Sequence, residues 1–191
     1  QRKNFMTQFQ QKGFEVVKEF IPPYFSLYLR NYFTLIVQND PSLGGDSQVP
    51  LSNSVYGDPA FEMVMAMSTQ DIAKTVGKNL MPQYTYARIY KNGSDLKIHT
   101  DRPECQYSVT LSLGGEYEKP WPIWIKDYAG KSHEVPLDVG DIVVYHGTEL
   151  EHWRERFEGN MQYQLFMHYV DREGEFKDRI YDGRPNLGLK K

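Results

Sequence analysis

The sequence has very little cysteine, no long apolar run and no excess of charge of either sign. Its 191 residues include a single cysteine, Cys105, which excludes a disulfide within the chain and favours a reducing compartment, so we expect a cytoplasmic protein. No apolar run approaches the roughly 20 residues of a membrane-spanning helix. With 22 Lys and Arg against 25 Asp and Glu, the net charge is −3. Because nucleic acids and membrane surfaces attract basic proteins, we expect neither as a partner.

The composition is that of a globular protein with many aromatic residues. Hydrophobic residues make up 40% and charged residues 25%, which excludes a disordered or fibrous chain. A chain of this length is typical of one domain that buries a substantial core. Aromatic residues reach 14%. We expect most of these rings to form the core, and some of those in the predicted strands to wall a cavity. These rings are Tyr84, Tyr86, Tyr90, Tyr107, Trp121, Trp124 and Tyr163.

Residues 1–80 are predicted to form a helical support region. After a short strand over 14–17, apolar residues recur at spacings of three and four over 24–37, which predicts an amphipathic helix. Residues 39–56 are rich in Pro, Gly, Ser and Asp and are predicted to form a loop.

A second helix is predicted to begin at Asp58, because an N-cap aspartate followed by Pro59 is a typical helix start. We expect it to end near Gly77 and to bury the methionines at 63, 65 and 67 in the core.

After residue 80 the pattern changes to short β-rich runs separated by Gly, Asn, Asp and Pro, which is typical of a sandwich or barrel. The runs are 84–90, 107–113, 121–126, 141–145 and 161–170. The fold class is therefore predicted as α+β, with helices packed on one outer face of a β-barrel-like core. We expect a single domain, with the barrel over 81–171 and a C-terminal tail over 172–191.

Two histidines and one aspartate form a candidate metal site. Alternate side chains of a strand share a face, so His99 and Asp101 are expected to point into one cavity. His152 follows 51 residues after Asp101, a gap that holds enough short strands to return beside them. Two histidines and a carboxylate form the facial triad of non-haem Fe(II) oxygenases. The alternative is that His152 is a surface histidine beside Trp153.

An ordered set of motifs over residues 80–170 resembles the Fe(II)/2-oxoglutarate-dependent dioxygenases, and among them the prolyl-4-hydroxylase-like branch. The motifs are Tyr86-Ala87-Arg88-Ile89-Tyr90, His99-Thr100-Asp101-Arg102-Pro103, Tyr107-Ser108-Val109-Thr110-Leu111, Gly140-Asp141, Tyr145-His146-Gly147, Glu151-His152-Trp153-Arg154-Glu155 and Phe166-Met167-His168-Tyr169-Val170. The resemblance implies a double-stranded β-helix (a cupin-like jelly roll) with N-terminal helices packed on one face.

The resemblance also implies the chemistry. Fe(II) is expected on His99, Asp101 and His152, with 2-oxoglutarate as cosubstrate and O2 as the oxidant. The expected reaction hydroxylates an unactivated C–H bond and releases succinate and CO2.

The expected cosubstrate pocket departs from the family pattern. Prolyl hydroxylases place an Arg or Lys about ten residues after the distal histidine, where this chain has Gln162. We expect Arg154 to replace that cation, with Arg102 as a second candidate that is better placed for the substrate. Other residues expected to bind 2-oxoglutarate are Tyr90, Thr110, Ser112, Gln162 and Gln164. Residues expected to contact the substrate are Arg102, Trp121 and Trp124.

Three functions remain open at this point. The first is hydroxylation of a protein side chain such as proline, and the second is the same chemistry on a free amino acid or amine. The third is a cupin-like metal-binding protein without 2-oxoglutarate turnover. In the first two, residues 39–56 and 93–96 are expected to close over the substrate. The sequence leaves the oligomeric state open.

Overall fold

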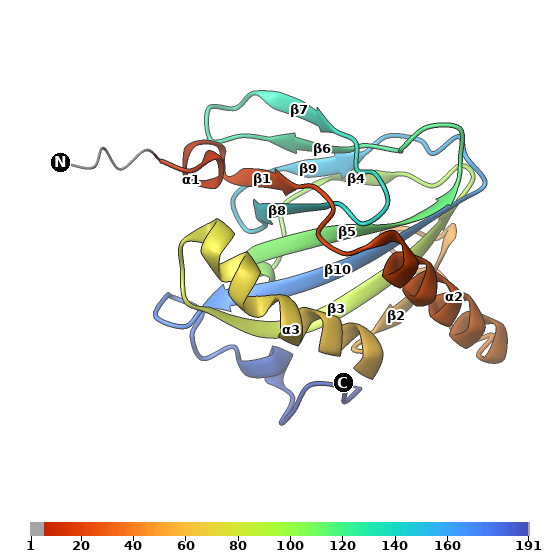
Figure 1. Ribbon diagram of the computed structural model, residues 1–191, viewed down its shortest axis with the longest axis horizontal. Helices are drawn as coiled ribbons and strands as arrows, with labels where there is room; N and C mark the ends of the chain where they lie inside the picture. The colour runs from red at the N-terminus through yellow and green to blue at the C-terminus, as the bar shows by residue number, and fades with distance from the viewer. Residues whose placement is uncertain (1–5, 191) are drawn as a thin grey trace.

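Two antiparallel sheets form the body of the protein in the computed structural model, which describes residues 6–190 (Figure 1). The major sheet runs in the order β1 (Phe14–Val17), β8 (Ile142–His146), β5 (Tyr107–Glu116), β10 (Met161–Asp171), β3 (Leu80–Lys91) and β2 (Ser52–Tyr56). The minor sheet runs in the order β4 (Leu96–His99), β9 (His152–Arg154), β6 (Ile123–Lys126) and β7 (Ser132–Val135). The prediction of an α+β jelly-roll fold is confirmed.

Helices cover the outer face of the major sheet. The helices are α1 (Gln8–Lys12), α2 (Pro23–Asn39) and α3 (Pro59–Val76), with short 3-10 turns η1 (Pro103–Cys105) and η2 (Ile180–Gly183). α2 packs on β5, and α3 crosses β3 and β10 (Figure 1). The Asp58 carboxylate accepts hydrogen bonds from the first N–H groups of α3, and Gly77 ends that helix with a φ of 76°. The predicted bounds of both long helices are therefore confirmed to within a few residues.

The long strands of the major sheet separate an apolar outer face from a polar inner face. Alternate residues point to opposite sides of a strand. The outer side of β5 and β10 buries Val109, Leu111, Leu113, Tyr163, Leu165 and Met167 in the core beneath the helices. The inner side of the same two strands carries Ser108, Thr110, Ser112, Gln162, Gln164 and His168, all of them buried. Apolar burial against the helices stabilises the sheet. On β5 and β10 the face toward the minor sheet is largely left for polar groups, whereas Val143 and Tyr145 of β8 pack against Ile123 and Ile125 of the minor sheet.

Some sequence predictions are corrected by this arrangement. The loop predicted over 39–56 ends at residue 51, because 52–56 pair with β3 as the edge strand β2. Met63 and Met67 are exposed, and only Met65 of the three methionines is buried. Tyr107 and Tyr163 pack in the core beneath the helices and do not wall the space between the two sheets, because they fall on the outer side of their strands.

The segment after β10 returns along the sheet and is held by a buried ion pair. Arg184 Nη2 lies 2.6 Å from Glu62 Oε1 of α3, and the two side chains are only 2% and 1% exposed. Residues 1–5 and 191, which belong to the expected support region and tail, lie outside the described residues. Within 6–190, no helix is both long enough and apolar enough to cross a membrane.

The Arg184–Glu62 pair gives a stability prediction. Replacing Glu62 with Gln leaves a buried guanidinium without its counter-charge, so we expect unfolding free energy to fall by about 3–5 kcal/mol in urea denaturation. The control is Asp71→Asn, which breaks the exposed pair with Lys74 and should cost less than about 1 kcal/mol. Equal losses of unfolding free energy in the two variants would show that the buried Arg184–Glu62 pair is no more important for stability than the exposed pair.

Candidate active site

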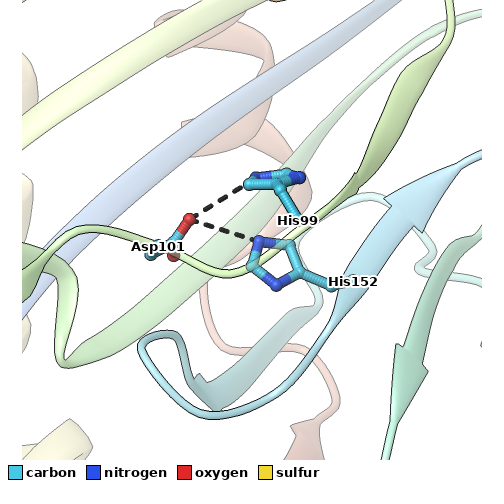
Figure 2. A group of neighbouring side chains, drawn as sticks. All are labelled: His99, Asp101 and His152. Carbon is cyan, nitrogen blue, oxygen red and sulfur yellow. Dashed lines mark ion pairs between the residues drawn. The ribbon is translucent and has the colours of Figure 1, made fainter.

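The three predicted metal ligands meet between the two sheets. His99 ends β4, His152 begins β9, and the two residues are direct cross-strand partners. Asp101 follows β4 by two residues, and its Oδ1 atom lies 3.5 Å from His99 Nε2 and 3.3 Å from His152 Nε2 (Figure 2). One ligand atom from each residue lies within 4.8 Å of the other two. The sequence therefore brings two imidazoles and a carboxylate to one point.

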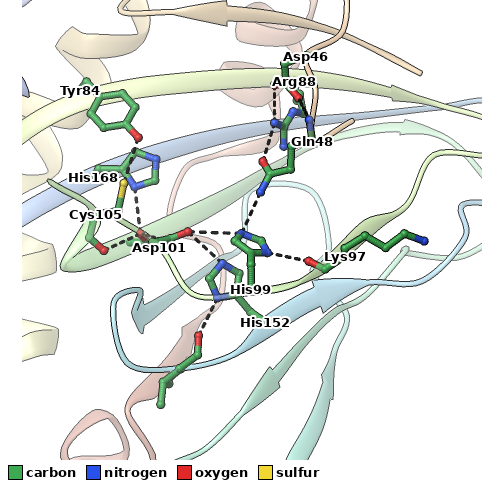
Figure 3. Close-up of polar contacts among 12 residues, drawn as sticks. Asp46, Gln48, Tyr84, Arg88, Lys97, His99, Asp101, Cys105, His152 and His168 are labelled. Atoms are coloured by element: carbon green, nitrogen blue, oxygen red, sulfur yellow. Dashed lines mark hydrogen bonds and ion pairs between the residues drawn. The ribbon is translucent and has the colours of Figure 1, made fainter. Parts of the chain in front are cut away.

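Both imidazoles have the tautomer that a metal requires. The Nδ1 atom of His99 lies 2.8 Å from the Lys97 carbonyl oxygen (Figure 3). The Nδ1 atom of His152 lies 2.9 Å from the Leu150 carbonyl oxygen. Each Nδ1–H therefore donates to the backbone, so Nε2 is the ring nitrogen that faces Asp101 and the metal position. This donor set fits a divalent transition metal such as Fe(II).

A hydroxyl group orients the aspartate. Ser108 Oγ donates to Asp101 Oδ2 at 2.8 Å, and it also lies 3.0 Å from His168 Nδ1. Burial alone would raise the pKa of the Asp101 carboxyl, but the charge and hydrogen bond of His152 and the hydrogen bond of His99 lower it well below its usual range. Asp101 is thus a carboxylate with Oδ2 engaged and Oδ1 facing the two histidines.

A glycine makes room for this carboxylate. A Cβ atom at Gly147 would lie 2.5 Å from Asp101 Oδ2 and 2.7 Å from Ser108 Oγ. The Gly147 carbonyl oxygen also accepts a hydrogen bond of 2.8 Å from the Asp101 backbone N–H. The turn before β9 must therefore have glycine at this position.

A cavity of about 440 Å³ opens beside the triad. Part of its lining comes from the loop before β2, with Asp46 and Gln48 at the mouth. Arg102 lines it from the other side, where the guanidinium is held by Asp182 at 2.7 and 3.0 Å. A small molecule or a single side chain fits a space of this size.

Arg154 is a buried cation with unused donors. It lies two residues after His152 on β9 and is 2% exposed. Its Nη1 donates to the Trp121 carbonyl oxygen at 2.8 Å, whereas Nε and Nη2 have no hydrogen-bond partner among residues 6–190. Burial lowers the pKa of its guanidinium. Buried charges without a partner are costly, so this position calls for an anion.

The other residues predicted to bind 2-oxoglutarate line the inner face of the major sheet opposite β9. Tyr90 pairs with Gln162 across strands β3 and β10, and its ring centroid lies 5.9 Å from the Arg154 guanidinium carbon. Gln162 Oε1 and Ser112 Oγ are buried without a partner within the described chain. Thr110 instead donates to Gln164 Oε1 at 2.8 Å. The unsatisfied atoms lie on the inner face with Tyr90 and Arg154, and none of these residues lines the cavity beside the triad.

The two tryptophans predicted to contact the substrate do not line the cavity that holds the triad. Trp121 is buried with its ring 4.9 Å from the Arg154 guanidinium carbon, so it forms the wall behind that cation. Trp124 stacks on Trp153, on the side of β6 opposite to the inward residues Ile123 and Ile125. The alternation of side chains along β6 therefore turns Trp124 away from the triad.

Four residues of the site were missed from the sequence. Arg88 faces the cavity from β3 and pairs with Asp46, Ser108 holds Asp101, and Gln48 reaches His99. A signal for Arg88 exists, because Tyr84, Arg88 and Tyr90 share one strand face and a charge inside a buried strand is unusual. No local pattern marks Gln48, which lies in an irregular loop.

Solved structures share this fold at low sequence identity. A Pseudomonas putida prolyl-4-hydroxylase superposes with a TM-score of 0.72 at 17% identity, over 86% of this chain and 95% of its own. A Trichoplax adhaerens prolyl hydroxylase in complex with a hypoxia inducible factor peptide has a TM-score of 0.71 at 14% identity, over 93% and 90%. HygX from Streptomyces hygroscopicus, with nickel, 2-oxoglutarate and hygromycin B bound, has a TM-score of 0.66 at 13% identity, over 86% and 85%.

This chain has the fold of the Fe(II)/2-oxoglutarate oxygenases. No family model matches the sequence, and the comparison with curated proteins found no match. The prolyl-hydroxylase-like fold that the motifs implied is confirmed at the level of architecture.

The triad gives a metal-binding prediction. Replacing His152 with Ala removes one of three ligands, so binding of Ni(II) or Fe(II) measured by calorimetry should weaken by at least about tenfold. His133→Ala is the matched control, because His133 pairs with Asp127 outside the triad. A triad variant that binds metal as the wild type does would show that the ion binds elsewhere.

Ser108 gives a second prediction about the same site. Ser108→Ala leaves Asp101 Oδ2 without its donor and frees the carboxylate to rotate, so metal affinity should fall by about 10–100-fold. Ser54→Ala, at an exposed position where the hydroxyl bonds to a backbone carbonyl, should leave the affinity unchanged. If both variants bind metal equally well, Ser108 does not orient the ligand.

Proposed function

We propose that the protein is an Fe(II)- and 2-oxoglutarate-dependent oxygenase that hydroxylates an unactivated C–H bond. The observation that carries the proposal is the relation between His152 and Arg154. They lie on one face of β9, about 7 Å apart along the strand, with the triad at one end and an unpaired buried guanidinium at the other. A five-carbon dicarboxylate suits this spacing, with one end at the metal and the other at Arg154.

Different residues would bind the metal and the cosubstrate. His99, Asp101 and His152 would hold Fe(II), and Ser108 keeps the carboxylate in one orientation. Arg154 would pair with the distal carboxylate of 2-oxoglutarate, with Tyr90, Gln162 and Ser112 as neutral partners and Thr110 and Gln164 beside them. Bound together, iron, 2-oxoglutarate and O2 supply an oxidant strong enough for C–H hydroxylation, with succinate and CO2 as by-products.

A protein side chain such as proline is the first substrate class. The similarity to a prolyl hydroxylase that binds a peptide supports it. A small molecule is the second class, and the cavity of about 440 Å³ and the similarity to HygX with hygromycin B bound favour it. In both classes Arg102 would contact the substrate from the cavity wall.

Arg154 gives the test of the proposed function. Arg154→Ala removes the charge that pairs with the distal carboxylate, so the 2-oxoglutarate concentration for half-maximal succinate release should rise by at least about tenfold. Metal binding should remain, because Arg154 contacts none of the three ligands. Arg156→Ala is the matched control, since Arg156 is exposed and paired with Glu158.

Two results would contradict the proposal in different ways. An unchanged 2-oxoglutarate requirement in Arg154→Ala would move the cosubstrate anchor to another cation. Absence of succinate release in the wild type, across a panel of peptides and metabolites, would leave a metal-binding protein without 2-oxoglutarate turnover.

A further inference from the structure

Besides Arg102, Arg88 lines the cavity beside the triad, and neither the metal nor the proposed cosubstrate uses it. Arg88 projects from β3, with its guanidinium carbon 5.1 Å from the Tyr86 ring centroid and 5.7 Å from that of Tyr90. Its side chain is 6% exposed. A charge held this deeply in a strand needs an anion beside it.

That anion comes from a loop and engages only part of the guanidinium. Arg88 Nη2 lies 2.6 Å from Asp46 Oδ2 (Figure 3). Arg88 Nη1 has one long contact, 3.4 Å to the Tyr90 hydroxyl, and Nε has no partner in the described part of the chain. A single hydrogen bond therefore joins Arg88 to Asp46, whereas arginine and carboxylate commonly form two parallel hydrogen bonds.

The same loop also engages a metal ligand. Gln48 accepts a hydrogen bond of 2.9 Å from Arg88 Nη2, and its amide nitrogen lies 3.2 Å from His99 Nε2 (Figure 3). Since Nε2 is the nitrogen that faces the metal position, the Gln48 contact and a metal bond exclude each other. The side-chain amide of Gln48 bridges Arg88 Nη2 and His99 Nε2, so these two atoms lie within about 9 Å of each other.

Resting on the proposed function, we infer that Arg88 binds a carboxylate group of the substrate and that Asp46 holds this position until the substrate arrives. The exposure of the two partners supports an exchange. The Asp46 side chain is 28% exposed and the Arg88 side chain 6%, so the aspartate returns to water at a smaller cost than the arginine.

The distance limits the size of the substrate. A carboxylate on Arg88 leaves a few ångströms to the triad, which is the length of two to four carbon–carbon bonds. The substrate class is therefore a short carboxylic acid, such as a free amino acid, oxidised at a carbon close to its carboxylate.

The experiment compares acids with their amides. The protein is loaded anaerobically with Fe(II) and saturating 2-oxoglutarate, and free L-amino acids and their α-carboxamides are titrated in matched pairs by calorimetry. We expect at least one acid to bind about tenfold or more tightly than its amide. If no acid binds more tightly than its amide, the inference is wrong.

Substitutions identify the group that recognises the acid. Arg88→Gln should reduce the preference for that acid to less than about twofold while 2-oxoglutarate affinity stays within about twofold of the wild type. Asp46→Asn should raise the affinity for the acid by about three- to tenfold, because the carboxylate that competes for Arg88 is removed. The control is Asp40→Asn, because Asp40 lies in the same loop but is hydrogen-bonded to Ser42. This substitution should leave the affinity for the acid unchanged.

The outcomes separate this inference from the proposed function. Loss of 2-oxoglutarate binding in Arg88→Gln would make Arg88 the cosubstrate anchor and overturn the inference. Weaker or unchanged acid binding in Asp46→Asn would also overturn it, and this variant decides the matter if Arg88→Gln does not fold. If the wild type itself shows no Fe(II)–2-oxoglutarate charge-transfer absorption, the proposed function has failed.

Discussion

The alternation of side chains along β3, β5 and β10 is the constraint on which the rest of the structure depends. Leu111 and Leu165 on one side bury apolar surface beneath the helices, and this burial stabilises the sheet. The other side is therefore available for Arg88, Ser108 and Gln162, which would otherwise destabilise a core. The minor sheet faces this polar surface and adds the two histidines.

Polar groups on this inner face are incompletely paired, and the incomplete pairing indicates where ligands bind. Interior polar atoms in folded proteins are nearly always hydrogen-bonded. Arg154 has two nitrogens without a partner in the described residues, and Gln162 and Ser112 each have an unsatisfied oxygen. By contrast, Asp101 and both histidines of the triad have their second atoms fixed by hydrogen bonds. The triad is thus fixed by hydrogen bonds, whereas polar atoms stay unsatisfied around Arg154, the position proposed for the distal carboxylate of 2-oxoglutarate.

The sequence predicted the elements whose signals are local. The N-cap at Asp58 and the apolar spacing over 24–37 depend only on near neighbours, and both helices form as expected. Spacing also identified His99, Asp101 and His152, because β4 and β9 are short and each ends or begins at a ligand. Strand β2 was missed, since its polar residues form a strand only by pairing with β3. Gln48 and Asp46 could not be found, because their contacts depend on how one loop folds over the cavity.

The most direct test of the central claim is an anaerobic titration of the protein with Fe(II) and then with 2-oxoglutarate, followed by visible absorption. A cosubstrate that chelates iron held by His99, Asp101 and His152 should produce a charge-transfer band that saturates at one equivalent of iron. The same titration of His152→Ala should give no band. If the wild-type protein binds Fe(II) but 2-oxoglutarate produces no band, the triad and Arg154 do not form an oxygenase site.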